Sequence, residues 1–287
     1  MHVVFGASSD LGRRVVGLLI DQGCRVRAIA RRPGHPPMPP LAEMHHADLS
    51  QPESIGPALA GARVVVNCAH ARFTPALLSA LPEQIDHVVL VGSAWRWSKA
   101  PEAAAREVRD AESLFLGSGC RGAMLHPTMI YGGAQENNLQ RILRMVRRFP
   151  VLPIPGGGRH LVQPVHIDDV AAAVVAAAMR SWTAAEVLAV PGAKPLMWRT
   201  MVELCAQALN ARVLLMDLPL APFLYLTETM ARLGLRPPVD PNILRRFRED
   251  VTFPVAPLHA ALGISPRPFQ SGLRDALSAW QTEGGRR

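Results

Sequence analysis

The first half of the chain alternates short apolar runs with segments of helical periodicity, and this alternation limits the fold more than any other feature. Such a pattern predicts βαβ units, whose parallel strands are buried between layers of helices. The strand-like runs are His2–Phe5, Arg25–Ala30, Glu43–His46, Arg63–Cys68, His87–Val91 and Gly122–His126, and the helical segments are Leu11–Gln22, Glu53–Ala60, Pro75–Leu81, Glu102–Leu116 and Asn137–Arg148. We therefore predict an α/β fold with a doubly wound parallel sheet of the Rossmann type.

The pattern changes near residue 150, where proline and glycine become frequent in PVLPIPGGGRH. The rest predicts a helix in HIDDVAAAVVAAAMR, a strand in EVLAVPG, a helix in TMVELCAQALN, a strand in RVLLMDLP and a largely helical end. We expect residues 1–150 to form a dinucleotide-binding core. Residues 151–287 should return a strand or two to the edge of the sheet and form a small, mostly helical lobe for substrate or partner contact.

The turn after the first strand, GASSDLG, resembles a phosphate-binding loop in which serine replaces the central glycine. Gly6 would permit a tight turn, and Gly12 would let the helix pack closely on the sheet. The amides of the first helical turn would face a pyrophosphate, and Ser9 could donate its hydroxyl to it. The alternative is an ordinary strand–helix turn. The residues expected to bind a dinucleotide here are Gly6, Ser8, Ser9, Asp10, Leu11 and Gly12.

The second strand ends in ARRPG, so Arg31 and Arg32 occupy the place where NAD-binding sites usually carry an acidic residue. A carboxylate would repel a 2′-phosphate, whereas a guanidinium can donate two hydrogen bonds to it. The sequence therefore favours NADP(H) over NAD(H). The alternative is that both arginines are simply solvated in a loop.

Three longer elements make most of the chain resemble the short-chain dehydrogenase/reductase superfamily. HADLSQPESIGPALAGARVVVNCAH is similar to the family's acidic–leucine element and fourth strand, LHPTMIYGGAQENN to the element after the sixth strand, and PGGGRHLVQPVHIDDVAAAVVAA to its aspartate–aspartate–valine element. The chain looks closest to the extended and atypical branches, which include NAD(P)-dependent epimerases and dehydratases. It is also similar to the dinucleotide-binding accessory subunit of respiratory complex I.

This resemblance implies further roles for particular residues. Asp48 and Leu49 should lie beside the adenine, and Cys68 and Ala69 should line the nucleotide after the fourth strand. Pro127 and Thr128 should lie near the nicotinamide. Asp169 should be structural, capping its helix and tying the lobe to the core. Acidic residues at a helix start are also stabilised by the helix dipole.

The chain departs from the family at its catalytic residues. VLVGSAWRWSK retains the serine after the fifth strand as Ser93, but the next helix reads PEAAAREVRDAESLF. Aligning Glu112 with the family's helix glutamate puts Ala104 in the tyrosine slot and Val108 in the lysine slot. The phenol that normally exchanges a proton with the substrate is therefore missing.

Other groups could replace this phenol. Our first choice as proton donor is Tyr131, with Ser93 orienting the substrate oxygen. Trp95 and Trp97 would form walls of the pocket. Further polar candidates, each expected more often to be structural than catalytic, are His70, Lys99, Arg106, Arg109, His126, His160 and His166.

Composition restricts the remaining classes of function. The formal net charge is +8, but the arginines are dispersed and only two tyrosines are present, so we expect no nucleic-acid surface. The four cysteines form no CxxC pair and no metal-ligand spacing, which predicts no metal site and favours the cytoplasm. No apolar run is long enough for an integral membrane segment. We expect a monomer or a homodimer.

Three functions stay open at this point. The first is an NADP(H)-dependent oxidoreductase or epimerase acting on a small or apolar carbonyl compound, since the run LLMDLPLAPFLYLTETMARLGL is apolar. The second is a non-catalytic NADPH-binding structural, assembly or redox-sensor protein, which the missing tyrosine and lysine would explain. The third is peripheral membrane contact through the helical run Phe223–Leu235, whose one cationic residue is weak support.

Overall fold

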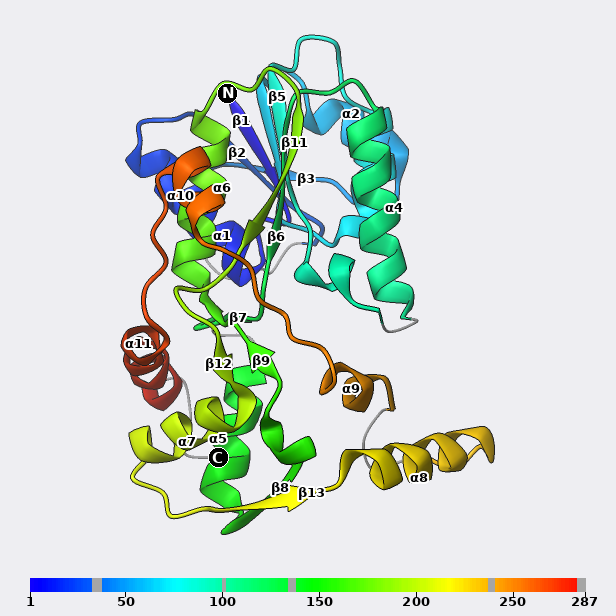
Figure 1. Cartoon of the computed structure of the whole chain (residues 1–287). Coiled ribbons are helices and arrows are strands. Elements are labelled where there is room, and N and C mark those ends of the chain that lie inside the picture. The colour runs from blue at the N-terminus through cyan, green and yellow to red at the C-terminus, as the bar shows by residue number, and fades with distance from the viewer. Residues whose placement is uncertain (33–37, 100–101, 134–137, 237–240, 283–287) are drawn as a thin grey trace.

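The computed structural model describes residues 1–32, 38–99, 102–133, 138–236 and 241–282. Its centre is a seven-stranded sheet with the order β11-β6-β5-β4-β1-β2-β3, in which every pair of neighbours is parallel (Figure 1). The strands are β1 (His2–Phe5), β2 (Val26–Ala30), β3 (Glu43–His46), β4 (Val64–Asn67), β5 (His87–Val91), β6 (Gly122–Pro127) and β11 (Ala185–Val190). The order of the strands reverses between β1 and β4, as in a doubly wound sheet. The predicted fold class is confirmed.

Helices cover both faces of this sheet (Figure 1). Helices α1 (Asp10–Asp21), α6 (Ile167–Met179) and α10 (Ala256–Leu262) share one apolar core with one face. Helices α2 (Pro52–Ala58), α3 (Thr74–Ser79) and α4 (Ala103–Gly117) cover the other face. In α1 the apolar positions of the helical period point inward, and Val15, Val16 and Leu19 are fully buried. Each such side chain contributes about 1.5–3 kcal/mol, so the loop before α1 is held on a rigid support.

The lobe has its own apolar core, which is formed by helices α5 (Asn138–Arg148), α7 (Trp198–Ala208) and α11 (Phe269–Thr282). Three short strand pairs connect it: β7 (Ile130–Tyr131) with β10 (Val165–His166), β9 (Leu161–Val162) with β12 (Leu196–Met197), and β8 (Val151–Pro155) with β13 (Leu214–Leu218). Helices α8 (Leu220–Arg232) and α9 (Pro241–Arg246) extend to one side of it (Figure 1). Short 3₁₀ turns are η1 (Ala71–Phe73), η2 (Ala94–Trp97) and η3 (Gly156–Gly158).

Core and lobe are interleaved along the sequence. Helix α5 precedes residue 150, yet its buried side chains pack in the lobe, while α6, β11 and α10 follow residue 150 and pack on the sheet. Of the strands expected to return to the sheet, β11 does so. The strand in RVLLMDLP, β13, instead pairs with β8 in the lobe. Residue 137, where the helix before residue 150 was expected to begin, and residues 134–137 of the LHPTMIYGGAQENN element lie outside the described residues.

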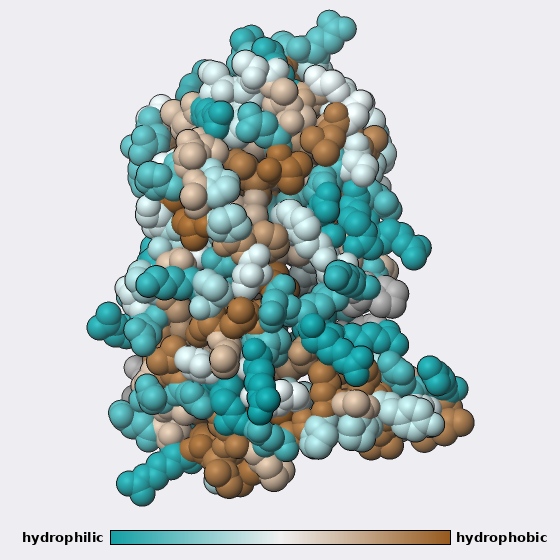
Figure 2. Space-filling model, in the orientation of Figure 1, coloured by the Kyte–Doolittle hydropathy of each residue, from teal (hydrophilic) through white to brown (hydrophobic). Residues whose placement is uncertain are grey.

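Apolar side chains are exposed at the lobe end of the molecule, over α8 and near β13 (Figure 2). They include Leu214, Tyr225 and Leu233, each more than half exposed. In the described ranges, none of the helices combines the length and the apolar character needed to cross a bilayer.

Candidate functional site

A cleft runs along the carboxyl edge of the central sheet and consists of two adjoining cavities of about 270 and 390 Å³. Ser9, Cys68 and Ala69 line both cavities, which therefore meet between the ends of β1 and β4. This is the point where the strand order reverses and where open α/β sheets bind their ligands. We call the smaller cavity the adenosine end and the larger cavity the nicotinamide end, after the cofactor that the cleft would hold.

The loop from β1 to α1 leaves no room for side chains at its two glycines. Gly6 has a φ of +70°, and a Cβ atom there would lie 2.7 Å from the amide nitrogen of Ala69. A Cβ atom on Gly12 would lie 2.2 Å from the carbonyl oxygen of Gly6. The helix therefore begins directly against the loop, which brings its first amides to the floor of the cleft. These contacts fit the roles predicted for both glycines.

Ser9 explains how the loop functions without its central glycine. Its φ is −74°, which any residue can adopt, and it is the N-cap of α1. The hydroxyl accepts a hydrogen bond from the Gly12 amide at 3.0 Å and donates one to the Gly6 carbonyl at 2.8 Å. Ser9 thus fixes the loop internally. Asp10 and Leu11, at the first two helical positions, line the cleft, and the N-terminal turn of a helix suits a phosphate.

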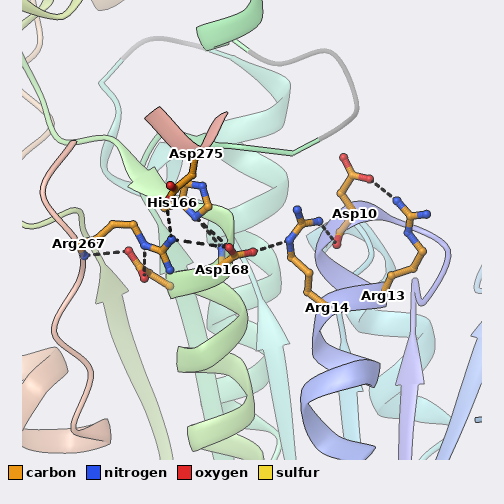
Figure 3. Close-up of polar contacts among 8 residues, drawn as sticks. Asp10, Arg13, Arg14, His166, Asp168, Arg267 and Asp275 are labelled. Carbon is orange, nitrogen blue, oxygen red and sulfur yellow. Dashed lines mark hydrogen bonds and ion pairs between the residues drawn. The ribbon is translucent and has the colours of Figure 1, made fainter. Parts of the chain in front are cut away.

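An ionic network surrounds this loop and joins α1, α6 and the C-terminal segment (Figure 3). Asp10 is nearly buried and pairs with Arg13 at 2.7 Å, so the Arg13 guanidinium balances the negative charge of this carboxylate beside the cleft. Arg14 donates to Asp168 at 2.6 Å. Asp169 accepts from the amide and the guanidinium of Arg267 at 2.9 and 3.0 Å. Asp169 therefore ties the C-terminal segment to α6.

The cap of α6 differs from the one expected. The ring of His166, not an aspartate, caps this helix, because its Nδ1 accepts from the Asp168 amide at 3.3 Å.

The adenosine end contains one of the two predicted arginines. Arg31, Asp48 and Leu49 line it together with Phe73, whereas Arg32 is exposed beside it and does not line it. Hydrogen bonds from the Ser50 hydroxyl and amide, together with Arg31 and Arg32, hold the pKa of Asp48 below its usual value. The carboxylate is therefore available as an acceptor. Gly6 and Ser8 complete the contact with the loop.

The nicotinamide end brings Ser93 together with two residues from elsewhere in the chain, His70 and Val108. The Ser93 hydroxyl accepts from the Trp95 amide at 3.3 Å and caps η2. Burial raises the pKa of the Cys68 thiol to about 12, so this lining thiol stays protonated. His70 accepts from the Arg72 amide through Nδ1 at 3.2 Å, and the same nitrogen lies 3.6 Å from Glu107 on α4.

A buried polar network supports the strand end behind Ser93. The Glu112 carboxylate accepts three hydrogen bonds of 2.7–2.9 Å from Arg96. It also lies 2.9 Å from Nε2 of His126, whose side chain is fully buried. Nδ1 of His126 accepts from the Ser93 amide at 3.0 Å, so the imidazole proton is on Nε2 and faces Glu112. Burial lowers the pKa of His126 and keeps the ring neutral. Burial would raise the pKa of Glu112, but Arg96 and His126 outweigh it and hold that pKa below its usual value.

Sequence reasoning noted His126 and Glu112 separately but did not connect them. The available signal was a histidine directly before the strand-end proline, together with a glutamate on the preceding helix. Of the other candidates named from sequence, Lys99 is exposed and Arg109 donates to the carbonyl oxygens of Arg96 and Ser98. Neither lines the nicotinamide end.

Tyr131 does not lie at the cleft. Its side chain is fully buried against His166 and Phe269, and its hydroxyl donates to the Phe269 carbonyl at 3.4 Å. Burial raises the pKa of this phenol. The structure thus gives Tyr131 a packing position between the core and α11, away from Ser93 and the other residues of the nicotinamide end.

Pro127 and Thr128 also lie outside the two cavities of the cleft. Pro127 is buried in β6 opposite Val190. Thr128 donates its hydroxyl to the Gln163 carbonyl and lines a third cavity, which shares Ile130 with the nicotinamide end. Within the described ranges, no cluster of histidine, cysteine and carboxylate side chains could hold a metal ion.

Comparison with known proteins agrees with this geometry. A family model described as NAD(P)H-binding matches residues 6–119, the segment that carries the loop, the adenosine end, most of the residues that line the nicotinamide end, and Glu112. An uncharacterised protein of Mycobacterium tuberculosis is 29% identical over 175 residues, which are 58% of this chain and 18% of that protein. The photosystem II assembly factor Ycf39 of Cyanophora paradoxa is 38% identical over 74 residues, 25% of this chain and 23% of the factor. The chain thus spans less than a quarter of the length of these relatives.

Solved structures match over almost the whole chain. The protein gox2253 has a TM-score of 0.82 at 20% identity, covering 100% of this chain and 99% of its own. MoeE5, solved with UDP-glucose and NAD, has a TM-score of 0.74 at 18% identity over 98% of both chains. The UDP-glucose 4-epimerase of Thermotoga maritima has a TM-score of 0.76 at 14% identity over 98% of this chain and 99% of its own.

These findings establish the fold of the protein. It has a Rossmann-type fold like that of the solved UDP-glucose 4-epimerase and of MoeE5. Residues 6–119 are an NAD(P)H-binding domain of the family that the model describes. The resemblance inferred from sequence is confirmed at this level, and the similarity to Ycf39 agrees with the atypical branch.

Proposed function

We propose that the protein binds NADP(H) in preference to NAD(H). The observation that carries this proposal is Arg31, which lines the adenosine end where a carboxylate would favour the ribose hydroxyls of NAD. Arg32 lies next to it and is exposed, so both guanidiniums can approach a 2′-phosphate from solvent. Charged hydrogen bonds of this kind contribute about 1.5–3 kcal/mol.

Titration of the protein with NADPH and with NADH tests this proposal. NADPH should bind more tightly, and Arg31→Ala with Arg32→Ala should remove most of the difference. Arg25→Ala is the matched control, because Arg25 is exposed just before the opposite end of the same strand. Equal affinity for the two cofactors in the unmodified protein would exclude the preference.

We further propose that the protein is an oxidoreductase or epimerase acting on a small or apolar carbonyl compound. The bound nicotinamide supplies or accepts the hydride in such chemistry. Ser93 would orient the substrate oxygen with its hydroxyl. The proton would come from His70, because it is the histidine among the described residues that line the nicotinamide end. Histidine is the side chain suited to proton transfer near neutral pH.

The surroundings of His70 favour this role. Nδ1 accepts from the Arg72 amide, so the neutral ring carries its proton on Nε2. The side chain is 48% exposed, so solvent can return the proton after transfer. The Glu107 carboxylate lies 3.6 Å from Nδ1. Tyr131 is buried away from the cleft, and we propose a packing role for it instead.

The experiment is stopped-flow oxidation of NADPH with aromatic and aliphatic ketones, for the parent, Ser93→Ala, His70→Gln and Tyr131→Phe. Ser93→Ala and His70→Gln should each slow turnover by about 10²–10⁴-fold. Tyr131→Phe should leave the rate unchanged. Turnover insensitive to His70→Gln would remove the proposed donor. A loss with Tyr131→Phe at unchanged stability would restore Tyr131.

The second candidate function is non-catalytic NADPH binding in an assembly or redox-sensor role. The observation in its favour is Val108, whose apolar side chain lines the nicotinamide end in the slot where the resemblance expects the lysine. Tight NADPH binding without turnover of any ketone would support this candidate. We also propose a cytoplasmic location and a monomeric or homodimeric state. The free cysteines Cys24, Cys68, Cys120 and Cys205 support the location. Peripheral membrane contact through α8 stays a prediction.

A further inference from the structure

A third cavity of about 500 Å³ lies between the core and the lobe, beside the nicotinamide end. Its walls come from η2, the segment after β6, α5, the region of β9, the start of α7 and the end of α9. Ile130 lines both this cavity and the nicotinamide end, so the two adjoin at this side chain. A cavity of this volume can hold one small organic molecule.

Aromatic rings from three separate segments meet in this cavity. His160 stacks on Trp198, with ring centroids 5.7 Å apart and an interplanar angle of 23°. Phe247 lies 4.5 Å from His160 and 5.4 Å from Trp198. Trp95 lines the cavity from η2 and carries the Arg246 guanidinium 3.6 Å from its ring centroid. Such rings offer flat faces and edges against which another ring can pack.

Most of the polar side chains around the cavity already have partners within the protein. The Gln163 amide bonds to the backbone of Gly192 and Phe253. Glu249 accepts from the Ser98 hydroxyl at 2.8 Å and from the Lys99 amide at 2.9 Å. Arg246 is paired with Glu102. A ligand with many hydroxyl groups would therefore find few free donors and acceptors here.

His160 differs from these three side chains. Its Nδ1 is buried and has no hydrogen-bond partner among the described residues. Burial lowers the pKa of this ring to about 4, so the imidazole is neutral at pH 7. A neutral ring stacks without the cost of burying a charge and can make one hydrogen bond at Nδ1.

We propose that this cavity binds a planar aromatic compound that carries a hydrogen-bonding oxygen, with its ring among Trp198, Phe247 and His160. As the substrate of a reductase this assignment rests on the function proposed above, but binding in the cavity does not. The observations disfavour a nucleotide-sugar, whose hydroxyls would be buried beside aromatic faces without partners, each at a cost comparable to a lost hydrogen bond.

Calorimetric titration of the whole chain, with and without NADPH, tests the proposal. The ligands are 2-acetonaphthone, cyclohexyl methyl ketone as the matched non-aromatic ketone, and UDP-glucose. The variants are Trp198→Leu and Phe247→Leu. Tyr225→Leu is the control, because it removes an aromatic ring from α8 that is 69% exposed and does not line the cavity. Circular dichroism checks that each variant is folded.

The naphthyl ketone should bind more tightly than both other ligands. Trp198→Leu and Phe247→Leu should each weaken it about two- to tenfold, the usual contribution of an aromatic contact, and Tyr225→Leu should leave it unchanged. Tighter binding of UDP-glucose, or equal binding of the naphthyl ketone to all variants, would overturn the proposal. The NADPH titration in the same series is a separate readout: if NADPH fails to bind while the naphthyl ketone binds as expected, the cofactor assignment fails and the aromatic site stands.

Discussion

Replacing Glu112 by glutamine should destabilise the protein far more than the small chemical change suggests. Glutamine has almost the shape of glutamate, but one of its two terminal acceptors becomes a donor. Arg96 donates to both carboxylate oxygens of Glu112, and Nε2 of His126 lies 2.9 Å from one of them, so in the variant one of these two side chains must face an NH₂ group. His126 is fully buried and cannot turn to water. An unsatisfied buried donor costs about 1–3 kcal/mol, and the lost charge-assisted bonds cost a similar amount, which the partly exposed Arg96 regains in part from solvent. We expect a loss of about 2–3 kcal/mol.

The chain contains a matched control for this change. Arg63 and Asp86 form the same kind of forked pair, at 2.9 and 2.7 Å, but their side chains are 59% and 45% exposed. Asp86→Asn should therefore cost at most about 1 kcal/mol. Urea denaturation of the parent and both variants at pH 7 measures the two losses.

Binding of NADPH provides a second readout of the same network. Because Nδ1 of His126 accepts a hydrogen bond from the Ser93 amide, Glu112→Gln should also weaken NADPH binding, whereas Asp86→Asn should not. Equal and small losses of stability in the two variants would show that the network does not support the strand end as argued.

Three further predictions concern the glycine loop, the buried His160 and the Asp169–Arg267 pair. Gly12→Ala should abolish NADPH binding at unchanged helix content, because the new Cβ atom meets the Gly6 carbonyl. In the control Gly56→Ala the new Cβ atom meets nothing, so this variant should bind NADPH normally and be about 0.4–1 kcal/mol more stable. Retained binding by Gly12→Ala refutes the loop geometry. The lowered pKa of His160 means that, as the pH falls, the unfolded chain binds a proton at this ring before the folded chain does, so the free energy of unfolding should fall between about pH 6.5 and about pH 4. His160→Phe should reduce this loss by about 1–2 kcal/mol after allowing for solvent screening, and an unchanged loss in denaturation at several pH values contradicts the assignment. Asp169→Asn should make the segment around Arg267 more accessible to hydrogen exchange at a cost of about 1–3 kcal/mol, and unchanged exchange there argues against the tie.

The central sheet could be predicted because each of its elements is encoded locally. The six expected strands and the expected helices all form, and none of the described ends differs from its expected position by more than two residues. The lobe was harder to predict because its strand pairs are only two to five residues long and join segments far apart in the chain. The apolar pattern of RVLLMDLP predicts a strand but does not say which partner it takes.

The residues of the site also fall into a group that local sequence patterns predict and a group that they do not. The loop residues and those at the ends of β2 and β4 meet because parallel strands end at one edge, so strand positions alone bring Gly6, Arg31 and Cys68 together. The network of Arg96, Glu112 and His126 depends on how α4 packs beside β6, which no local pattern specifies. Tyr131 was expected at the cleft because it follows a strand end, but the chain turns into β7 there and carries the phenol under α11.

The apolar Val108 and the aromatic third cavity favour the same kind of ligand. By resemblance, Val108 stands in the slot of a lysine, so no charged side chain is offered there to a substrate hydroxyl at the nicotinamide end. A hydroxyl turned toward Val108 would lose its bonds to water and cost about 1–3 kcal/mol. Beyond Ile130 the same molecule would meet the rings of His160, Trp198 and Phe247. A site with few free polar groups rejects polar ligands because their groups would be left unpaired, whereas a flat apolar ligand gains at both places. The apolar Val108 and the aromatic cavity are therefore better explained together, by one flat apolar ligand, than separately.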